Sequence, residues 1–192
     1  MIQSWFLKGR WGYAEHSATS PKKGLELKDY GRCQFCGSHA EGGVFECFDV
    51  FNDMQIHFMD GSGVNQFIFA DAHCLQHSEV HGKWNNNLHL TRMYLMLEKE
   101  IEWKYAKTSR LSHVLDQYKS SHPEILIPAL PVQERGGLTV MDLIGLKEKK
   151  LNSMLLKWAN DVYRSYDRYH SSAKLWAISI STNMNDKMEA DL

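Results

Sequence analysis

Four of the ten histidines and one of the four cysteines of this chain lie between residues 71 and 89. The other three cysteines stand upstream, two of them in the motif Cys33-Gln-Phe-Cys36-Gly37 and the third at Cys47. No other region gathers so many side chains that can bind a metal ion. The sequence therefore predicts a Cys/His metal site carried on a helical body.

The motif around Cys33 and Cys36 looks like a zinc knuckle. Its two-residue gap lets both thiolates face one ion, and Gly37 supplies the turn that brings backbone N–H groups toward the sulfurs. A redox dithiol is the alternative, and it would be expected where a strand ends and a helix begins. Here both flanks read as loops, which favours metal binding.

The remaining ligands are open at this point. Cys47 could turn back to join the knuckle, or it could be a buried thiol that packs as a small hydrophobe. If the chain is helical from Ala70, His73 and His77 share one helix face, because they are four residues apart. The candidates for the fourth ligand are His73, Cys74, His77 and His81. Alternatively, His73, His77 and Asp71 could form an open site of their own.

Two kinds of centre can be drawn from these residues. Three thiolates and one imidazole would give a closed tetrahedral zinc site that stabilises the fold. A harder set would instead form an open site able to hold activated water, with zinc, iron or manganese; its members are Asp71, His77, His89 and His170. A nucleophilic pair of Cys74 with His77 or His81 can also be drawn, and whether the chain is an enzyme stays open.

The apolar pattern predicts a mainly α-helical domain with an irregular, zinc-knuckle-like N-terminal third. Apolar positions repeat with a helical period over residues 88–107 and 151–178, the periodicity over 45–59 is mixed, and shorter helices are expected over 70–77 and 111–120. Thr139 and Asp142 resemble a capping box at the start of a short helix that runs to residue 146. We expect an N-terminal arm over residues 1–30, a metal-binding helical domain over 31–178 and a flexible tail over 179–192.

The charge and hydropathy of the chain limit the kinds of partner and the cellular location that we expect. The net charge is −1, so no overall field draws the chain to nucleic acid, and the basic and aromatic residues of the last helix read as an ordinary amphipathic face. No apolar run of about 18 residues exists to span a bilayer. The first residues lack the apolar stretch of a signal peptide, so we expect a cytoplasmic protein with reduced thiols. A protein partner could dock on the last helix or on the N-terminal arm.

The order of these motifs resembles a bacterial family catalogued as a domain of unknown function. The shared pattern is Cys-x-x-Cys-Gly, a lone Cys, Asp-Ala-x-x-x-Gln-His, and His-Leu at a helix start, followed by a proline-containing loop, a Thr-Val helix start and a long helix rich in Trp. The matching positions over residues 31–178 are Cys33, Cys36, Gly37, Cys47, Asp71, Ala72, Gln76, His77, His89, Leu90, Thr139, Val140, Trp158, His170 and Trp176.

The chain departs from that family at two positions. Ser78 stands where the family usually has proline, and Cys74 is not a family position, which makes Cys74 and His81 weaker candidates and favours His77 as the fourth ligand. We therefore expect a largely structural zinc site, in which Asp71 and Gln76 orient the ligands. Its ligands would be Cys33, Cys36, Cys47 and His77. The resemblance implies no reaction.

Overall fold

The computed structural model describes residues 26–58, 64–80, 84–103, 105–118 and 126–179. These residues form a mainly α-helical fold, so the predicted fold class is confirmed. Two isolated β-bridges, Gly31 to Gly42 and Arg32 to His39, are the β-pairing found in this part of the chain. Residues 1–25 of the expected arm and 180–192 of the expected tail lie outside the described residues, so the division into arm, domain and tail stays a prediction.

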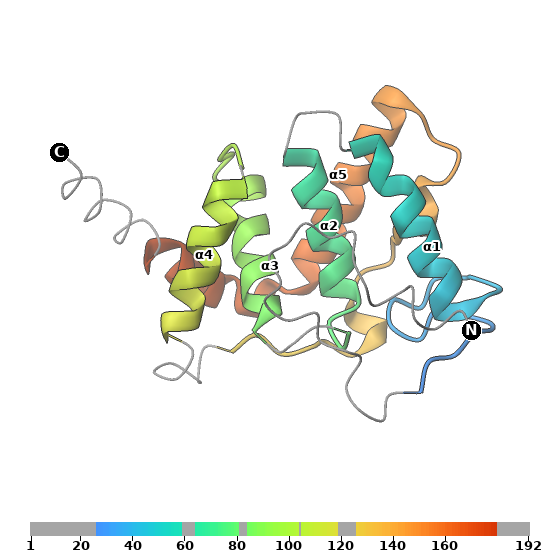
Figure 1. Ribbon diagram of the computed structural model, residues 1–192, viewed down its shortest axis with the longest axis horizontal. Helices are drawn as coiled ribbons and strands as arrows, with labels where there is room; N and C mark the ends of the chain where they lie inside the picture. The colour runs from blue at the N-terminus through green and yellow to red at the C-terminus, as the bar shows by residue number, and fades with distance from the viewer. Residues whose placement is uncertain (1–25, 59–63, 81–83, 104, 119–125, 180–192) are drawn as a thin grey trace.

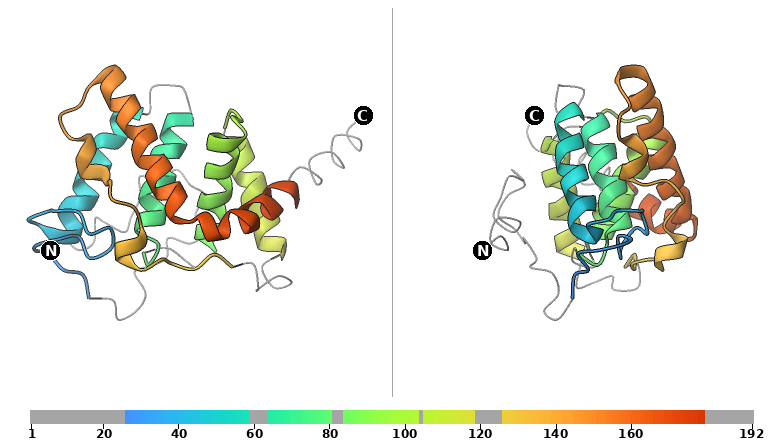
Figure 2. Two further views of the ribbon diagram at one scale, coloured as in Figure 1. Left: turned by 180° about the vertical axis from the view of Figure 1, so that it is seen from behind. Right: turned by 90° about the vertical axis from the view of Figure 1, so that its right-hand side faces the viewer.

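Helix α2 (Val64–Gln76) is the centre of the fold. Helices α1 (Gly43–Gln55) and α3 (Asn85–Met93) lie on either side of it, with α4 (Tyr105–Tyr118) beyond α3 (Figure 1). Seen from behind, α5 (Glu148–Ser165) crosses the other face of α2 (Figure 2). Residues 67–78 are all buried as a result, so the polar side chains among them need partners inside the protein.

Three contacts fasten α5 and the turn after it to α2. Trp158 is fully buried and packs edge-on against Phe69, with ring centroids 5.7 Å apart. The indole Nε1 of Trp158 also donates a hydrogen bond of 3.0 Å to the Gln76 side chain. The hydroxyl of Tyr166 donates to the backbone carbonyl of Leu75 at 2.9 Å. Each of these aromatic side chains thus buries its ring and still satisfies its polar end.

Several predicted elements are confirmed with shifted ends. Helix α1 continues as a 3₁₀ turn (Ile56–Phe58), close to the predicted 45–59, and α2 begins earlier than residue 70. The capping box is present: Thr139 accepts from the Met141 N–H at 3.3 Å, and Asp142 accepts from the Thr139 N–H at 2.7 Å. It caps a 3₁₀ helix (Val140–Leu143). Among the described helices, none is both long and apolar enough to cross a bilayer.

The single helix predicted over residues 88–107 is wrong. Helix α3 passes into a π-helix (Tyr94–Glu98), the chain breaks, and α4 starts at residue 105. At the break Glu100 has φ of 50°, the Ile101 N–H bonds back to the Leu95 carbonyl at 3.0 Å, and Trp103 turns into the core. The apolar period runs through the break because both sides face the same core, so periodicity alone could not reveal it.

The helix predicted over residues 151–178 is also interrupted. Helix α5 ends at Ser165, a 3₁₀ turn (Asp167–Tyr169) follows, and residues 170–179 are helical again. The buried Tyr166 stands at the bend, where its hydroxyl is tied to α2. Beyond the bend Trp176 packs edge-on against Trp84, with ring centroids 6.2 Å apart. The bend therefore lets both halves of the apolar stripe stay in the core.

Candidate metal centre

The Cys33–Cys36 loop is closed by its own backbone. The Gly37 N–H donates to the Cys33 carbonyl at 2.8 Å, and the Cys33 N–H donates to the Ser38 carbonyl at 2.9 Å. Gly37 has φ of 73°, a left-handed conformation that favours glycine. Both cysteines are buried beneath this turn. The two-residue spacing thus produces the tight turn that it predicted.

Helix α1 is held at its first two residues against the segment that precedes this loop. The Val44 N–H donates to the Lys28 carbonyl at 3.0 Å. Gly43 has φ of 58°, and a Cβ atom added there would lie 2.4 Å from the same carbonyl oxygen. Only glycine allows this approach of the two backbones. The contact fixes the start of α1, and Cys47 one turn further on therefore faces the loop.

His77 directly follows α2 and presents one ring nitrogen to the sulfurs. Its Nδ1 lies 2.8 Å from the backbone carbonyl of His73. A carbonyl only accepts, so Nδ1 carries the proton and Nε2 offers a lone pair in the neutral ring. Nε2 lies 3.5 Å from Sγ of Cys33 and 3.4 Å from Sγ of Cys47. The ring is thus oriented for binding a metal through Nε2.

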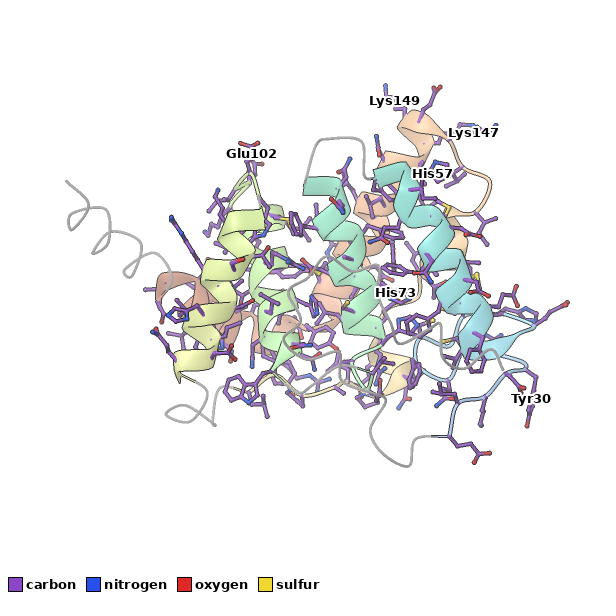
Figure 3. All side chains as sticks on the ribbon, viewed as in Figure 1. Tyr30, His57, His73, Glu102, Lys147 and Lys149 are labelled. Atoms are coloured by element: carbon purple, nitrogen blue, oxygen red, sulfur yellow. The ribbon has the colours of Figure 1, made fainter. Side chains whose placement is uncertain are left out.

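Aromatic rings hold the imidazole in place. The ring of His73 stacks on that of His77 at 3.9 Å, and Phe51 of α1 stacks on the other side of His73 at 3.8 Å. Figure 3 labels His73 on the side of α2 toward α1. Phe35 and Phe48 meet the His77 ring edge-on. His73 therefore supports His77 by its carbonyl and its ring, and it does not join the cluster.

The four side chains meet at one buried point. Sγ of Cys36 and Sγ of Cys47 are 3.7 Å apart. The four potential ligand atoms, from Cys33, Cys36, Cys47 and His77, lie within 4.8 Å of one another. All four cysteines are free thiols. Within the described residues this is the one group of three or more His, Cys, Asp or Glu side chains placed to hold a metal ion.

The electrostatics of the cluster favour a bound cation. Hydrogen bonds from Cys36 and Cys47 hold the pKa of the Cys33 thiol well below its usual range, whereas bonds to Cys33 and Cys36, with burial, raise that of Cys47. Burial acts to lower the pKa of His77, but hydrogen bonds with Cys33 and Cys36 outweigh it and raise the pKa to about 10. A buried thiolate needs a positive partner, either a proton on His77 or a metal ion.

Two residues near the cluster were not predicted. Ser38 Oγ lies 3.1 Å from Sγ of Cys36, where its hydroxyl can donate to a thiolate. The buried Arg135 donates to the carbonyls of Phe35 at 2.9 Å and Gln76 at 2.8 Å, which ties the cysteine loop to the end of α2. Ser38 could have been found from its place next to the knuckle glycine, but no sequence pattern marks Arg135 as buried.

Asp71 belongs to a second buried cluster between α2 and α3. Its carboxylate accepts from His89 Nδ1 at 2.7 Å and from Arg92 Nε at 2.8 Å. Arg92 also donates to Thr108 of α4 at 3.1 Å, and its guanidinium lies 4.7 Å from the ring centroid of Phe67. The carboxylate predicted to orient a metal ligand thus contacts none of the four residues above and ties α2 to α3.

The other described residues that the sequence suggested for a metal site are not part of the Cys₃His cluster either. The Gln76 amide donates to the carbonyls of Arg135 at 3.0 Å and Leu138 at 2.7 Å and contacts no cysteine. His170 Nε2 lies 2.9 Å from the Tyr163 carbonyl. The structure therefore does not bring the open set of Asp71, His77, His89 and His170 to a common point. Cys74 is not part of the Cys₃His group, and His81 lies outside the described residues.

Fold and site define a class: a helical protein with a buried Cys₃His cluster able to hold a metal ion. The family model described as a family of unknown function (DUF5946) matches residues 31–167, and the chain belongs to this family. The predicted resemblance to a family of unknown function is confirmed, with a match that ends at residue 167 and not at 178. No curated protein and no solved structure matches the chain.

Proposed function

We propose that this chain is a zinc-binding protein in which Cys33, Cys36, Cys47 and His77 hold one structural ion. The supporting observation is the spacing of the ligand atoms. With Zn–S of about 2.3 Å and Zn–N of about 2.0–2.1 Å, a tetrahedral site has S···S edges of about 3.8 Å and S···N edges of about 3.5 Å. The separations of 3.7, 3.5 and 3.4 Å described above match these edges.

The donor set and its burial support zinc in a structural role. Three thiolates and one imidazole are soft ligands that suit zinc. The exposed fractions of Cys33, Cys36, Cys47 and His77 are 1%, 5%, 0% and 0%, so four protein ligands would fill the coordination sphere with no place for water. Free thiols as ligands require a reducing compartment, so the proposal includes a cytoplasmic location.

The ion would fasten three separate segments. The cysteine loop, α1 and the end of α2 contribute ligands that are up to 44 residues apart along the chain. The loop has little regular structure of its own, and the apolar core lies mainly among the helices. A bound ion would therefore supply folding free energy where the backbone has little regular structure. This places its main effect in the N-terminal third of the described chain.

Elemental analysis of the purified protein tests the proposal, with His77→Ala and His89→Ala as a matched pair of buried histidines. We expect one zinc per chain, lost in His77→Ala and kept in His89→Ala. Cobalt substitution adds a second measurement, because cobalt–thiolate charge-transfer bands report sulfur ligands directly. Iron or manganese in place of zinc, a second ion, or a loss that follows His89 would contradict a closed Cys₃His zinc site.

A further inference from the structure

Cys74 is the cysteine that the metal site leaves out, and it lies beside His89. Cys74 and Asp71 are three residues apart on α2, so they share the face that meets α3. His89 Nδ1 bonds to the Asp71 carboxylate at 2.7 Å, and the side chains of Cys74 and His89 are hydrogen-bonded. Because Asp71 occupies Nδ1, Nε2 is the nitrogen that remains for the thiol. The order is carboxylate, imidazole, thiol.

The charges around this group favour a thiolate beside an imidazolium. Arg92 pairs with Asp71 and balances its charge, so a proton on His89 is matched by negative charge on Cys74. Burial acts to lower the pKa of His89, but the charge of Cys74 and the hydrogen bond to Asp71 outweigh it and raise the pKa to about 9. With all four groups ionised their charges sum to zero, so each buried charge has an opposite partner.

Cys74 is buried like the other three cysteines, although its exposed fraction is the highest of the four. The exposed fractions of Cys74 and His89 are both 8%, whereas Cys36, Cys33 and Cys47 have 5%, 1% and 0%. Reactive thiols lie beside a positive charge, which a protonated His89 supplies here.

We propose that Cys74, His89 and Asp71 form a second site, in which Cys74 is a nucleophile toward small acyl compounds such as esters and thioesters. Sγ attacks the carbonyl carbon, an S–C bond forms, and the bond from carbon to the leaving alcohol or thiol breaks. His89 gives its proton to the leaving group. Water then attacks the acyl carbon, His89 takes a proton from it, and the C–S bond breaks to release a carboxylic acid.

Asp71 is a positioning residue in this site, because it touches His89 and not the acyl group. Its carboxylate fixes the proton on Nδ1 and so directs Nε2 to the thiol. The site shares no residue with the Cys₃His cluster. The proposal therefore stands or falls independently of zinc binding.

The experiment uses the full-length protein with its metal and p-nitrophenyl acetate as the acyl donor. We expect release of p-nitrophenol, with an acetyl group on Cys74 trapped by acid quenching and seen by peptide mass spectrometry, and the loss of both in Cys74→Ser. The rate of iodoacetamide labelling at Cys74 is then measured at pH 8.5 and pH 6.5. An ordinary thiol reacts about 50-fold faster at the higher pH, because its pKa is about 8.5. For a thiolate paired with His89 we expect a ratio below about 3, and a return to about 50 in His89→Asn.

The rate ratio does not depend on how easily the reagent reaches the thiol, so it separates reactivity from access. His113→Asn, at an exposed position of α4, is the control and should leave both measurements unchanged. A ratio near 50 in the unsubstituted protein, an unchanged ratio in folded His89→Asn, or release of p-nitrophenol that Cys74→Ser leaves unchanged would overturn the proposal. If circular dichroism shows that His89→Asn does not fold, the ratio of labelling rates in the unsubstituted protein is by itself the test of the proposal.

Discussion

Helix α2 serves two buried clusters of ionisable side chains that are built in opposite ways. At its end, His77 faces three sulfurs from the loop and α1. On its other side, Asp71 faces His89 and Arg92 of α3. The first cluster gathers thiols around one imidazole, and the second gives one carboxylate two cationic partners. One helix thus carries two kinds of buried cluster. In the first the acidic thiols outnumber the single basic group, and in the second the carboxylate is neutralised by cationic side chains of the protein.

This difference indicates which of the two clusters needs a bound ion to neutralise its buried charge. Thiolates in the first cluster have only the imidazole as a protein cation, so a metal ion is the partner that completes it. The carboxylate in the second is already matched by a buried guanidinium at hydrogen-bonding distance. A buried pair of this kind is held by its own geometry and needs no ion. We therefore expect metal removal and charge removal to act on separate parts of the molecule.

The largest effect should come from removing the metal with a chelator or by Cys47→Ser. Structural zinc contributes about 10–16 kcal/mol in zinc-finger peptides. Because the helices around α2 have their own core, we expect a smaller loss here, about 4 kcal/mol or more in the free energy of unfolding. Hydrogen exchange should show lost protection in residues 31–55 and retained protection in α5.

Cys74→Ser is the matched control for this experiment, since it removes the cysteine that lies outside the metal cluster. It should keep one metal per chain and the protection of α1. Equal loss of protection in α1 and α5 would mean that the two regions are one unit, and the comparison between the clusters would fail.

The next largest effect is expected from Asp71→Asn. The substitution takes a full charge from the partner of Arg92, whose side chain is fully buried. Breaking a buried ion pair from one side costs about 3–5 kcal/mol. Urea unfolding should show this loss, while elemental analysis should show an unchanged metal content.

A double-mutant cycle sharpens this result. Asp71→Asn combined with Arg92→Met should cost less than the sum of the two single changes, because the second change removes the uncompensated charge. Metal loss in Asp71→Asn would show that Asp71 supports the metal site after all, as the sequence alone suggested.

A smaller loss of stability is expected from a change at the contact between α1 and the segment that precedes the cysteine loop. Gly43→Ala would place Cβ 2.4 Å from the Lys28 carbonyl oxygen at a left-handed φ. Such strain costs about 1–3 kcal/mol before the clash is relieved. We expect faster metal release, measured with a chromogenic chelator, and a matching loss of stability. Gly137→Ala, with no atom within 4 Å of the added Cβ, should change neither.

The cysteine loop was predictable from the sequence because its geometry is local. Two residues between Cys33 and Cys36, followed by a glycine, leave few ways to turn the chain. His77 was singled out by family resemblance, since its distance from the cysteines is set by the packing of α2 and not by any spacing. The role given to Asp71 was not found: a carboxylate among histidines reads as part of a metal site until its partner Arg92 is known.

The partner of Asp71 did leave one signal in the sequence. His89 and Arg92 are three residues apart on α3, so they share a helix face, as Asp71 and Cys74 do on α2. What the sequence lacks is the pairing of the two faces. That pairing depends on long-range packing, and the same limit explains why Cys74 was paired with His77 or His81 and not with His89.

The smallest effect should come from Ser38→Ala. This substitution tests how much the hydrogen bond from Ser38 to the Cys36 sulfur contributes to metal affinity. The Ser38 hydroxyl lies 3.1 Å from Sγ of Cys36, and a metal-bound thiolate would accept its hydrogen bond. Groups that hold a ligand in this way typically contribute about 10–100-fold in metal affinity. We expect a weakening near the lower limit, measured by competition with a chelator, and little change in the protection of α5. An affinity equal to that of the unsubstituted protein would mean that the backbone turn and Arg135 orient Cys36 without help, since both would remain in place.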